Sequence, residues 1–447
     1  MTNAITNAVT NVYQELPEKV KAFFDRQYKD SYALIDAARH PRTGLYGDAF
    51  MTFGPNPENR CSIAATGVGL ISLCVADLEG WDDNAAEKAR VTLRGVTGEI
   101  EGCRVARDTF TGFYAHFVDM ETGENLNSEI STIDTSLLVA GALFAGEHFK
   151  DRAPDIAAMA YDLLRSIDWR VVVADKNKGV INMIVKDGIG TAPLPAYNEY
   201  VLVSYLALLG QPENPDIRDL WYNNFAEERM HELPKSKYRD ITVLTDTTTN
   251  HSAFLSSFVH QFPFYLVPEY AKSPTYRDYF ANACLADRLK WKELQDVPSY
   301  VWGYGAGPND GLFGGYHADK IGNSPHNIAS AYIVAGFLPV YPAGIYDLFA
   351  LYQLHIPYDS YTNPNDKEDE RKFRAAYRYG LHRYSWWHLE QPNRWYPTKI
   401  TLIDWSSMLY GLTAFKRGMA FFTERLVELE QLQTGTASYA DDQNTIA

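Results

Sequence analysis

Two stretches of this 447-residue chain are apolar on almost every helical face. Residues 62–78 read S-I-A-A-T-G-V-G-L-I-S-L-C-V-A-D-L, and residues 198–209 read N-E-Y-V-L-V-S-Y-L-A-L-L. A helix without a polar face is stable in water only when other elements surround it. The chain is therefore expected to place these helices inside a layer of covering helices.

Helical periodicity also extends over most of the remaining chain. Proline in the first turn, as at Pro17 and Pro154, and glycine after the last turn, as at Gly80 and Gly210, mark helix ends. The further predicted helices span residues 15–35, 84–96, 135–149, 154–167, 219–230, 252–266, 274–293, 325–337, 343–352, 371–379 and 405–432.

Strand signals are sparse. Residues 169–175 and 180–186 flank K-N-K-G and predict one β-hairpin. No repeat of constant period and no Pro/Ser/Gly-rich linker interrupts the chain, so a single all-α domain over residues 1–433 is expected. An α/α toroid, two concentric rings of helices, fits the number of helices. Residues 434–447 are small and polar and are expected to fray.

Composition excludes several classes of protein. The net charge of -15 and the absence of a Lys/Arg cluster argue against a nucleic-acid or anionic-membrane partner. No apolar stretch approaches a membrane span. The four cysteines lack CxxC spacing and predict buried core residues. No signal peptide is visible, so we expect a cytoplasmic protein, or a secreted or periplasmic one if a leader has been removed.

Signatures of cofactor, metal and nucleophile chemistry are missing from the sequence. There is no HExxH, no Cys/His cluster, no phosphate-binding glycine motif and no G-x-S-x-G. We therefore expect no cofactor and no metal. The 30 Tyr, 22 Phe and 9 Trp often lie in polar, Gly-rich segments, where aromatic faces suit sugar rings. Many of these aromatic residues are equally consistent with core packing.

Four acidic residues stand at or near predicted helix starts. Glu129 and Asp134 follow a short loop or hairpin, Glu199 opens the apolar helix 198–209, and Asp404 directly precedes the last helix. A carboxylate at a helix start is also an ordinary cap, and this reading stays open for Asp134 and Glu199. Burial beside apolar neighbours would raise the pKa of Glu199, as a general acid requires.

Further residues are expected to contact a ligand. The segment 303–315 carries six glycines among aromatic residues and is typical of a substrate-facing loop. The predicted substrate-contacting residues are Glu129, His116, Tyr197, Asn198, Gln261, Trp302, Tyr304, Asp310, Tyr316, Trp386, Trp387 and Trp395.

Several motifs together resemble one known family. The run E-I-S-T-I-D-T-S-L-L with the upstream G-F-Y-A-H-F-V-D, the segment A-Y-N-E-Y-V-L-V-S-Y, and the loop W-G-Y-G-A-G-P-N-D-G-L-F-G-G-Y are similar to segments of the glucoamylase-like glycoside hydrolases, the group that contains the endo-β-1,2-glucanases. The similar segments occur in the same order as in that family, from about Ser62 to Asp404. The chain departs from the family pattern after Asp404, where Trp405-Ser406 replaces glutamine-glycine.

The resemblance implies an (α/α)6 toroid and an anomer-inverting hydrolase of a β-linked glucan. By motif, Glu199 would be the general acid and Asp404 the general base. Glu129 and Asp134 would lie in the substrate groove, Asp134 as a third catalytic candidate, and Asp310 in its roof. Two rival functions remain: a toroidal sugar epimerase or lyase that uses His116, His260 and His317, and an inactive glycan-binding protein.

Overall fold

A computed structural model of the chain describes residues 12–53, 59–194, 197–247, 253–309, 315–355, 367–385, 395 and 397–429. Half a dozen helices begin close to the predicted residues, since Pro and capping residues mark their starts. The helices are α2 (Glu18–Ala37), α3 (Ile63–Glu79), α4 (Ala85–Thr97), α5 (Thr132–Phe149), α6 (Pro154–Arg165), α7 (Val201–Gly210), α8 (Pro215–Asn224), α9 (Phe258–Leu266), α10 (Pro268–Lys272), α11 (Pro274–Lys292), α12 (Ala331–Gly336), α13 (Gly344–His355), α14 (Lys367–Ala376), α15 (Leu402–Arg417) and α16 (Ala420–Thr423).

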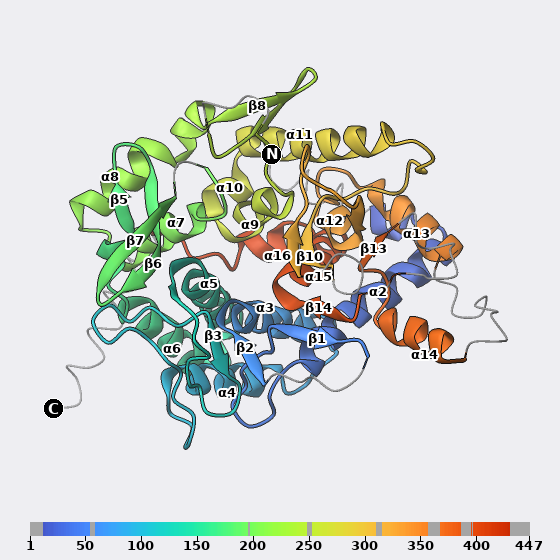
Figure 1. Ribbon diagram of the computed structural model, residues 1–447. Helices are drawn as coiled ribbons and strands as arrows, with labels where there is room; N and C mark the ends of the chain where they lie inside the picture. Colours follow the sequence, from blue (N-terminus) through green and yellow to red (C-terminus); the bar gives the residue numbers. More distant parts are fainter. Residues whose placement is uncertain are drawn as a thin grey trace.

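Six helices contact one another in a cycle. Helix α3 packs on α5, α5 on α7, α7 on α9, α9 on α12, α12 on α15, and α15 again on α3. Helices α2, α4, α6, α8, α11 and α13 pack on members of this cycle. Figure 1 shows α3, α5 and α15 near the middle of the molecule, with α4, α8, α11 and α14 at its periphery. The two apolar segments of the sequence are α3 and α7, both members of the cycle, which confirms the expectation that they are enclosed.

Small sheets are more numerous than the single predicted hairpin. Within the described residues, five two-stranded sheets and one four-stranded sheet occur. The predicted hairpin forms β5 (Val173–Asp175) and β6 (Val180–Lys186), but residues 169–172 form the 3₁₀ helix η1 (Trp169–Val172) instead of a strand. Strands β4 (Ile130–Ser131) and β7 (Ile189–Leu194) also pair with β6. The extra strands have only two to six residues, and several of them pair across long sequence distances, so periodicity could not reveal them.

Four of these strands lead directly into helices of the cycle. The strands are β2 (Arg60–Ser62) before α3, β4 before α5, β12 (Ile328–Ser330) before α12, and β14 (Lys399–Thr401) before α15. Each ends in Ser or Thr at the residue preceding its helix. Antiparallel pairing joins β2 to β3 (Phe117–Asp119), β12 to β13 (Arg383–Ser385) and β14 to β1 (Ala49–Met51). These pairings fix where the helices begin.

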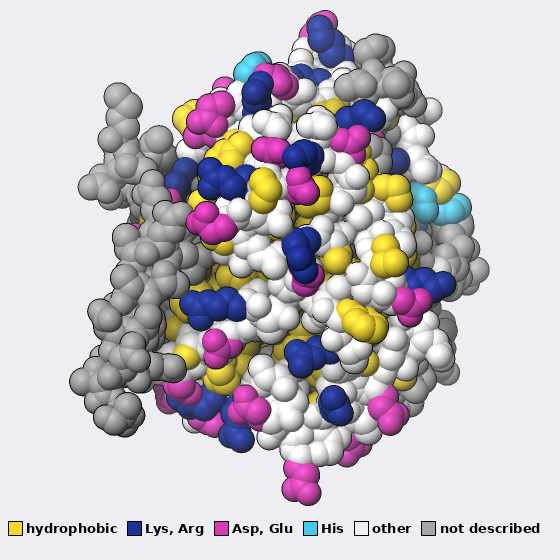
Figure 2. Space-filling view, turned by 90° about the vertical axis from the view of Figure 1, so that its left-hand side faces the viewer, with side chains coloured by type: hydrophobic (Ala, Val, Ile, Leu, Met, Phe, Trp, Pro, Cys, Tyr) yellow, Lys and Arg dark blue, Asp and Glu magenta, His cyan; other side chains and the backbone are white. Residues whose placement is uncertain are grey.

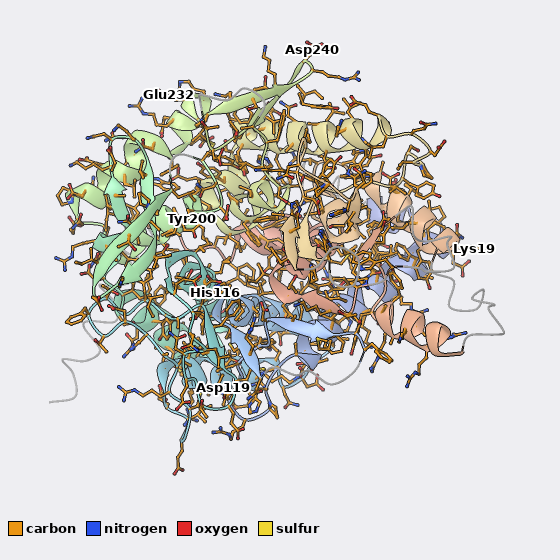
Figure 3. All side chains as sticks on the ribbon, viewed as in Figure 1. Lys19, His116, Asp119, Tyr200, Glu232 and Asp240 are labelled. Carbon is orange, nitrogen blue, oxygen red and sulfur yellow. The ribbon has the colours of Figure 1, made fainter. Side chains whose placement is uncertain are left out.

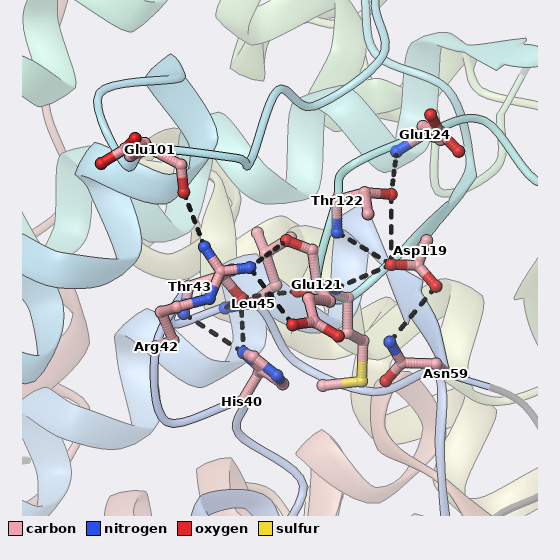
Figure 4. Close-up of polar contacts among 11 residues, drawn as sticks. His40, Arg42, Thr43, Leu45, Asn59, Glu101, Asp119, Glu121, Thr122 and Glu124 are labelled. Atoms are coloured by element: carbon pink, nitrogen blue, oxygen red, sulfur yellow. Dashed lines mark hydrogen bonds and ion pairs between the residues drawn. The ribbon is translucent and has the colours of Figure 1, made fainter.

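The long connection between α4 and α5 is held by polar contacts. The Arg42 guanidinium donates to the carbonyl oxygens of Glu101, at 2.7 Å, and Glu121, at 2.8 Å (Figure 4). The Asp119 carboxylate accepts hydrogen bonds from the backbone of Thr122 and from the Asn59 amide. The connection that carries His116 and Glu129 is therefore attached to the segments before and after β1.

The remaining strands lie away from the cycle or beside its rim. They are β8 (Lys235–Tyr238) paired with β9 (Ile241–Leu244), which follow the 3₁₀ helix η2 (Glu227–Glu232), and β10 (Ala306–Pro308) paired with β11 (Tyr316–Ala318). No described helix is long and apolar enough to cross a membrane. All four cysteines are buried and unpaired, as predicted. On the face in Figure 2, acidic and basic side chains are interspersed.

Candidate active site

Glu199 lies in the turn that leads into α7. The Asn198 side-chain oxygen accepts a hydrogen bond from the Tyr200 amide at 2.8 Å, and this local contact delays the helix until Val201, three residues after the predicted start. Glu199 is partly buried. Burial raises the pKa of its carboxyl, a backbone N–H lowers it, and the charge of Asp246 raises it again. Among the described residues, no side chain donates a hydrogen bond to this carboxyl.

Asp404 occupies the first turn of α15 in a different environment. It is 4% exposed, and its two oxygens accept hydrogen bonds from the hydroxyls of Thr401 and, at 3.0 Å, Tyr316. Burial raises the pKa of Asp404 to about 6, while the two hydroxyls and the charge of Arg383 oppose that rise. The negative charge of Asp48 raises the pKa further. Asp404 is thus a buried carboxylate with donors on both oxygens.

Asp134 repeats this local arrangement at the start of α5. The hydroxyl of Ser131, the residue before the helix, donates to the Asp134 carboxylate at 2.5 Å and accepts from the Asp134 amide at 3.2 Å. The imidazole of His116 lies between two acids, with Nδ1 2.9 Å from Glu129 and Nε2 3.4 Å from Asp134. Burial raises the pKa of Asp134, and the charge of His116 opposes the rise. Ser131, and not Asp134, therefore caps the helix, while Asp134 belongs to an acidic cluster in its first turn.

The charges of Glu199, Asp134 and Glu129 all act on the hydroxyl of Tyr200. Burial raises the pKa of Tyr200, and the charges of Glu199, Asp134 and Glu129 raise it further, so all three acids lie within electrostatic range of one hydroxyl. In Figure 3, the labelled Tyr200 and His116 lie towards the middle of the molecule, whereas Lys19, Glu232 and Asp240 lie at its edge.

Asp48 joins the Asp134 cluster to Asp404. Its charge raises the pKa of both of these carboxyls. Its backbone oxygen accepts a hydrogen bond from the Leu402 amide at 3.0 Å, which places it beside the start of α15. Sequence reasoning missed Asp48, because it precedes a three-residue strand and no helix start marks it. Its only sequence signal is the G-L-Y-G-D-A-F turn.

Several predicted substrate-contacting residues are instead enclosed. Trp302 is fully buried and its indole N–H donates to Asp347 at 2.9 Å, while Tyr304 is 2% exposed. Gln261 is fully buried, with its amide donating to the Ile333 carbonyl at 3.0 Å. Trp395 is 5% exposed. These four side chains are nearly inaccessible to solvent, although their Gly-rich or polar surroundings favour exposed positions, and their contact with a substrate stays a prediction.

Tyr197 is buried in a polar network next to Glu199. Its hydroxyl lies 2.6 Å from that of Tyr276 and 3.2 Å from Nδ1 of His260. The Tyr276 hydroxyl donates to the His260 carbonyl at 2.8 Å, so it must accept from Tyr197, which in turn accepts from His260. Tyr197 therefore anchors the turn that carries Glu199 through this buried network. Asn198 is likewise committed to its backbone contact.

Among the described residues of this site, the ring of Tyr316 is an exposed aromatic surface. It is 57% exposed although its hydroxyl reaches Asp404. The predicted contact residues Asp310, Trp386 and Trp387 lie outside the described residues.

The histidines of the rival proton-transfer hypothesis do not meet. His116 contacts Glu129 and Asp134, His260 contacts Tyr197, and Nδ1 of His317 lies 3.2 Å from Asp319. Burial lowers the pKa of His260 to about 4. No group of three or more metal-ligating side chains occurs in the part of the chain that the structure describes.

Solved structures resemble this chain over most of its length. The endo-β-1,2-glucanase of Chitinophaga pinensis, solved with sophorotriose and glucose, is 16% identical with a TM-score of 0.72, over 93% of this chain and 97% of that one. The β-1,2-glucanase of Parabacteroides distasonis gives 14% and 0.71, over 94% of this chain and 60% of that one. The endo-β-1,2-glucanase of Talaromyces funiculosus with β-1,2-glucan gives 13% and 0.60, over 98% and 89%. No protein-family model and no curated sequence matches. The chain has the fold of these solved structures.

Proposed function

We propose that this protein is a glycoside hydrolase that cleaves a β-linked glucan, with β-1,2-glucan the first substrate to test, and that it inverts the anomeric configuration. The fold shared with solved β-1,2-glucanases supports the class. We further propose that the cycle of six helices and its covering helices form an (α/α)6 toroid. The catalytic domain would then comprise residues 1–433.

The contrast between Glu199 and Asp404 is the observation that carries the mechanism. An inverting glycosidase needs one carboxyl that is protonated and one that is ionised at the same pH. Burial and an acidic neighbour act on Glu199 with only a backbone donor opposing them. Burial acts on Asp404 too, but two hydroxyl donors and a guanidinium favour its ionised form. This difference in hydrogen-bond donors supports Glu199 as the acid and Asp404 as the base, with Asp404 ionised above its pKa of about 6.

In the proposed reaction, Glu199 donates its proton to the glycosidic oxygen as the bond to the anomeric carbon breaks. Asp404 accepts a proton from a water molecule that attacks the opposite face of the sugar. The two carboxyls of an inverting enzyme stand roughly 6.5–9.5 Å apart to leave room for that water. The His116, Glu129 and Asp134 cluster, with two of its acids near Tyr200, would bind sugar hydroxyls beside the acid.

The proposal is tested with wild type, Glu199→Gln and Asp404→Asn on β-1,2-, β-1,3-, β-1,4- and β-1,6-glucans. New reducing ends and the anomer of the first product, read by NMR, are the measurements. Glu228→Gln on the 3₁₀ helix η2 is the matched control, because Glu228 is an exposed acid outside the acidic clusters. We expect an inverted product, loss of at least about 10³-fold in kcat for both site variants, and wild-type activity for the control.

Three other outcomes would change the proposal. Retained anomeric configuration would reject the inverting mechanism. Unchanged turnover in Glu199→Gln would reject the assignment of the acid. Sugar binding by calorimetry without turnover by the wild type on any of these glucans would favour a glycan-binding protein.

A further inference from the structure

A buried arginine, Arg383, lies close enough to Asp404 for its charge to act on that carboxyl. Arg383, the first residue of β13, is 2% exposed. Its guanidinium donates to the Gly305 carbonyl and the Ser330 hydroxyl, both at 2.9 Å, and to the Asn309 side-chain oxygen at 2.8 Å. It also pairs with the carboxylate of Asp319, which is 1% exposed. A planar guanidinium fork can hold several acceptors in one fixed arrangement, which a lysine cannot do.

Three of the four acceptors of Arg383 flank the strands of one hairpin, β10–β11. Gly305 directly precedes β10, Asn309 directly follows it, and Asp319 directly follows β11. Ser330 is the last residue of β12 and pairs with Arg383 itself. The arginine therefore attaches the hairpin β10–β11 to the start of α12.

The hairpin carries Tyr316 at the first position of β11, opposite Pro308. From there the Tyr316 hydroxyl donates to Oδ1 of Asp404 at 3.0 Å. Strand β10 also packs against β14, the strand that leads into the helix of Asp404. A displacement of the hairpin would thus move this hydroxyl relative to the carboxylate.

Four groups act on the Asp404 carboxylate from the surrounding elements. Thr401 on β14 and Tyr316 on β11 donate hydrogen bonds, and Arg383 on β13 contributes a positive charge, all of which lower its pKa. Asp48, beside β1, contributes a negative charge that raises it. The Thr401 hydroxyl donates to Oδ2 of Asp404, so the hydrogen bond from Tyr316 is the one that orients Oδ1.

We propose that Arg383 is a positioning residue for the reaction, which holds the hairpin β10–β11 so that the Tyr316 hydroxyl orients the general base Asp404. The exposed Tyr316 ring is at the same time a stacking surface for the sugar bound over that base. The inference rests on the proposed role of Asp404. A clamp that served stability alone would be an unusual use of a buried ion pair, because apolar replacements of such pairs are often at least as stable.

Steady-state kinetics across pH separate this role from a purely structural one. Tyr316→Phe keeps the ring and removes the hydroxyl, so kcat should fall about tenfold or more while KM stays within about twofold. The acidic limb of the kcat profile should move to higher pH, because the ionised form of Asp404 loses a donor. Tyr316→Ala should in addition raise KM.

Arg383→Lys keeps the positive charge and removes the planar guanidinium that holds several acceptors at once. If both residues act through the same hydroxyl, Arg383→Lys should shift the acidic limb in the same direction, and the double variant with Tyr316→Phe should lose little more than the stronger single variant. Multiplicative losses in the double variant, or an acidic limb that stays at the wild-type pH in both single variants, would overturn the proposal.

Matched controls come from groups of the same kind that lie off the hairpin. Tyr384→Phe removes a buried hydroxyl that has no hydrogen-bond partner among the described residues, one residue after Arg383. Arg425→Lys alters a partly buried arginine whose guanidinium donates to the Phe421 carbonyl of α16. Both controls should keep the wild-type pH profile. A shifted acidic limb in either one would count against a specific role for the clamp.

A second variant keeps the test decisive if Arg383→Lys does not fold, as judged by circular dichroism. Asn309→Ala removes one acceptor of the clamp without uncovering the Asp319 carboxylate, and it should shift the acidic limb partially. A wild-type profile in Asn309→Ala would reject the clamp. Loss of activity in Asp404→Asn together with unshifted Tyr316 and Arg383 variants would reject this inference alone, whereas retained activity in Asp404→Asn would reject the proposed base.

Discussion

Asp404→Asn should stabilise the folded protein at neutral pH while abolishing turnover. The wild-type carboxyl is 4% exposed, and its pKa rises from 3.8 to about 6 on folding. An acid whose folded pKa is raised is harder to ionise in the folded state than in the unfolded state. Its contribution therefore destabilises the fold as pH rises from about 4 through 6, and the full penalty is present above that window. The uncharged amide escapes this penalty.

The size of the effect follows from the shift. Two pKa units correspond to about 3 kcal/mol of folding free energy above pH 7. Part of that gain is lost because an amide is a weaker acceptor for the Tyr316 and Thr401 hydroxyls, by about 1 kcal/mol. The net gain is about 2 kcal/mol. Unfolding entropy of about 2 cal/mol/K per residue gives about 1 kcal/mol/K for a chain of this length, so Tm should rise by about 2 °C.

Scanning calorimetry at pH 7.5 and pH 4 tests this reasoning. The variant should melt above the wild type at pH 7.5, and the difference should vanish or reverse at pH 4, where the wild-type carboxyl is protonated. Glu228→Gln, an exposed acid on η2, should change Tm at neither pH. An Asp404→Asn variant that melts at or below the wild type at pH 7.5 would refute the idea that an ionised, buried Asp404 costs folding stability.

Two further predictions concern the frame around the site. Gly141→Ala in α5 should cost 3 kcal/mol or more, roughly the upper range for overpacking, because its Cβ would lie 2.1 Å from the Gly67 backbone oxygen of α3. In Gly146→Ala, in the same helix, the added Cβ meets only atoms beyond 3 Å, so the substitution should cost less than about 1 kcal/mol of folding free energy. Urea denaturation measures both costs. Equal costs would contradict the close contact between α5 and α3 at Gly141. His148, whose pKa burial lowers to about 4 although Asp77 hydrogen-bonds it, should stay neutral down to pH 5 in an NMR titration. Its contribution to stability should be lost as pH falls from 6.5 towards 4, because the unfolded chain then binds the proton more readily.

Local sequence signals located most helices but not the segments between them. Helix α6 begins at the predicted Pro154, and the residue before α3 is Ser62, whose side chain caps the helix. The predicted helix 325–337 is shorter, since residues 328–330 pair as β12 with a strand more than fifty residues later. Such a partner lies beyond the range of periodicity or capping rules.

The site was predictable where an acid stands at a helix start and was missed where tertiary contacts decide. Asp134 and Asp404 follow Ser131 and Thr401 by three residues, a spacing that the sequence displays. Trp302 was expected to be exposed, because it stands in a Gly-rich segment. The Asp287 carboxylate, from α11, instead accepts hydrogen bonds from the backbone of that segment at Gly303 and draws it into the interior. No pattern in the sequence connects these distant residues.

The short strands that precede α3, α5, α12 and α15 have a consequence for how this site can change. Each is held by backbone hydrogen bonds, which form whatever side chains the strand carries. The helix starts, and the acids placed on them, are thus fixed by the main chain. Side chains that project from the strands and hairpins without contacting the acids can be exchanged without moving the carboxylates. Substrate preference can therefore be redesigned on this scaffold by substitutions at the rim, while the reacting groups keep their places.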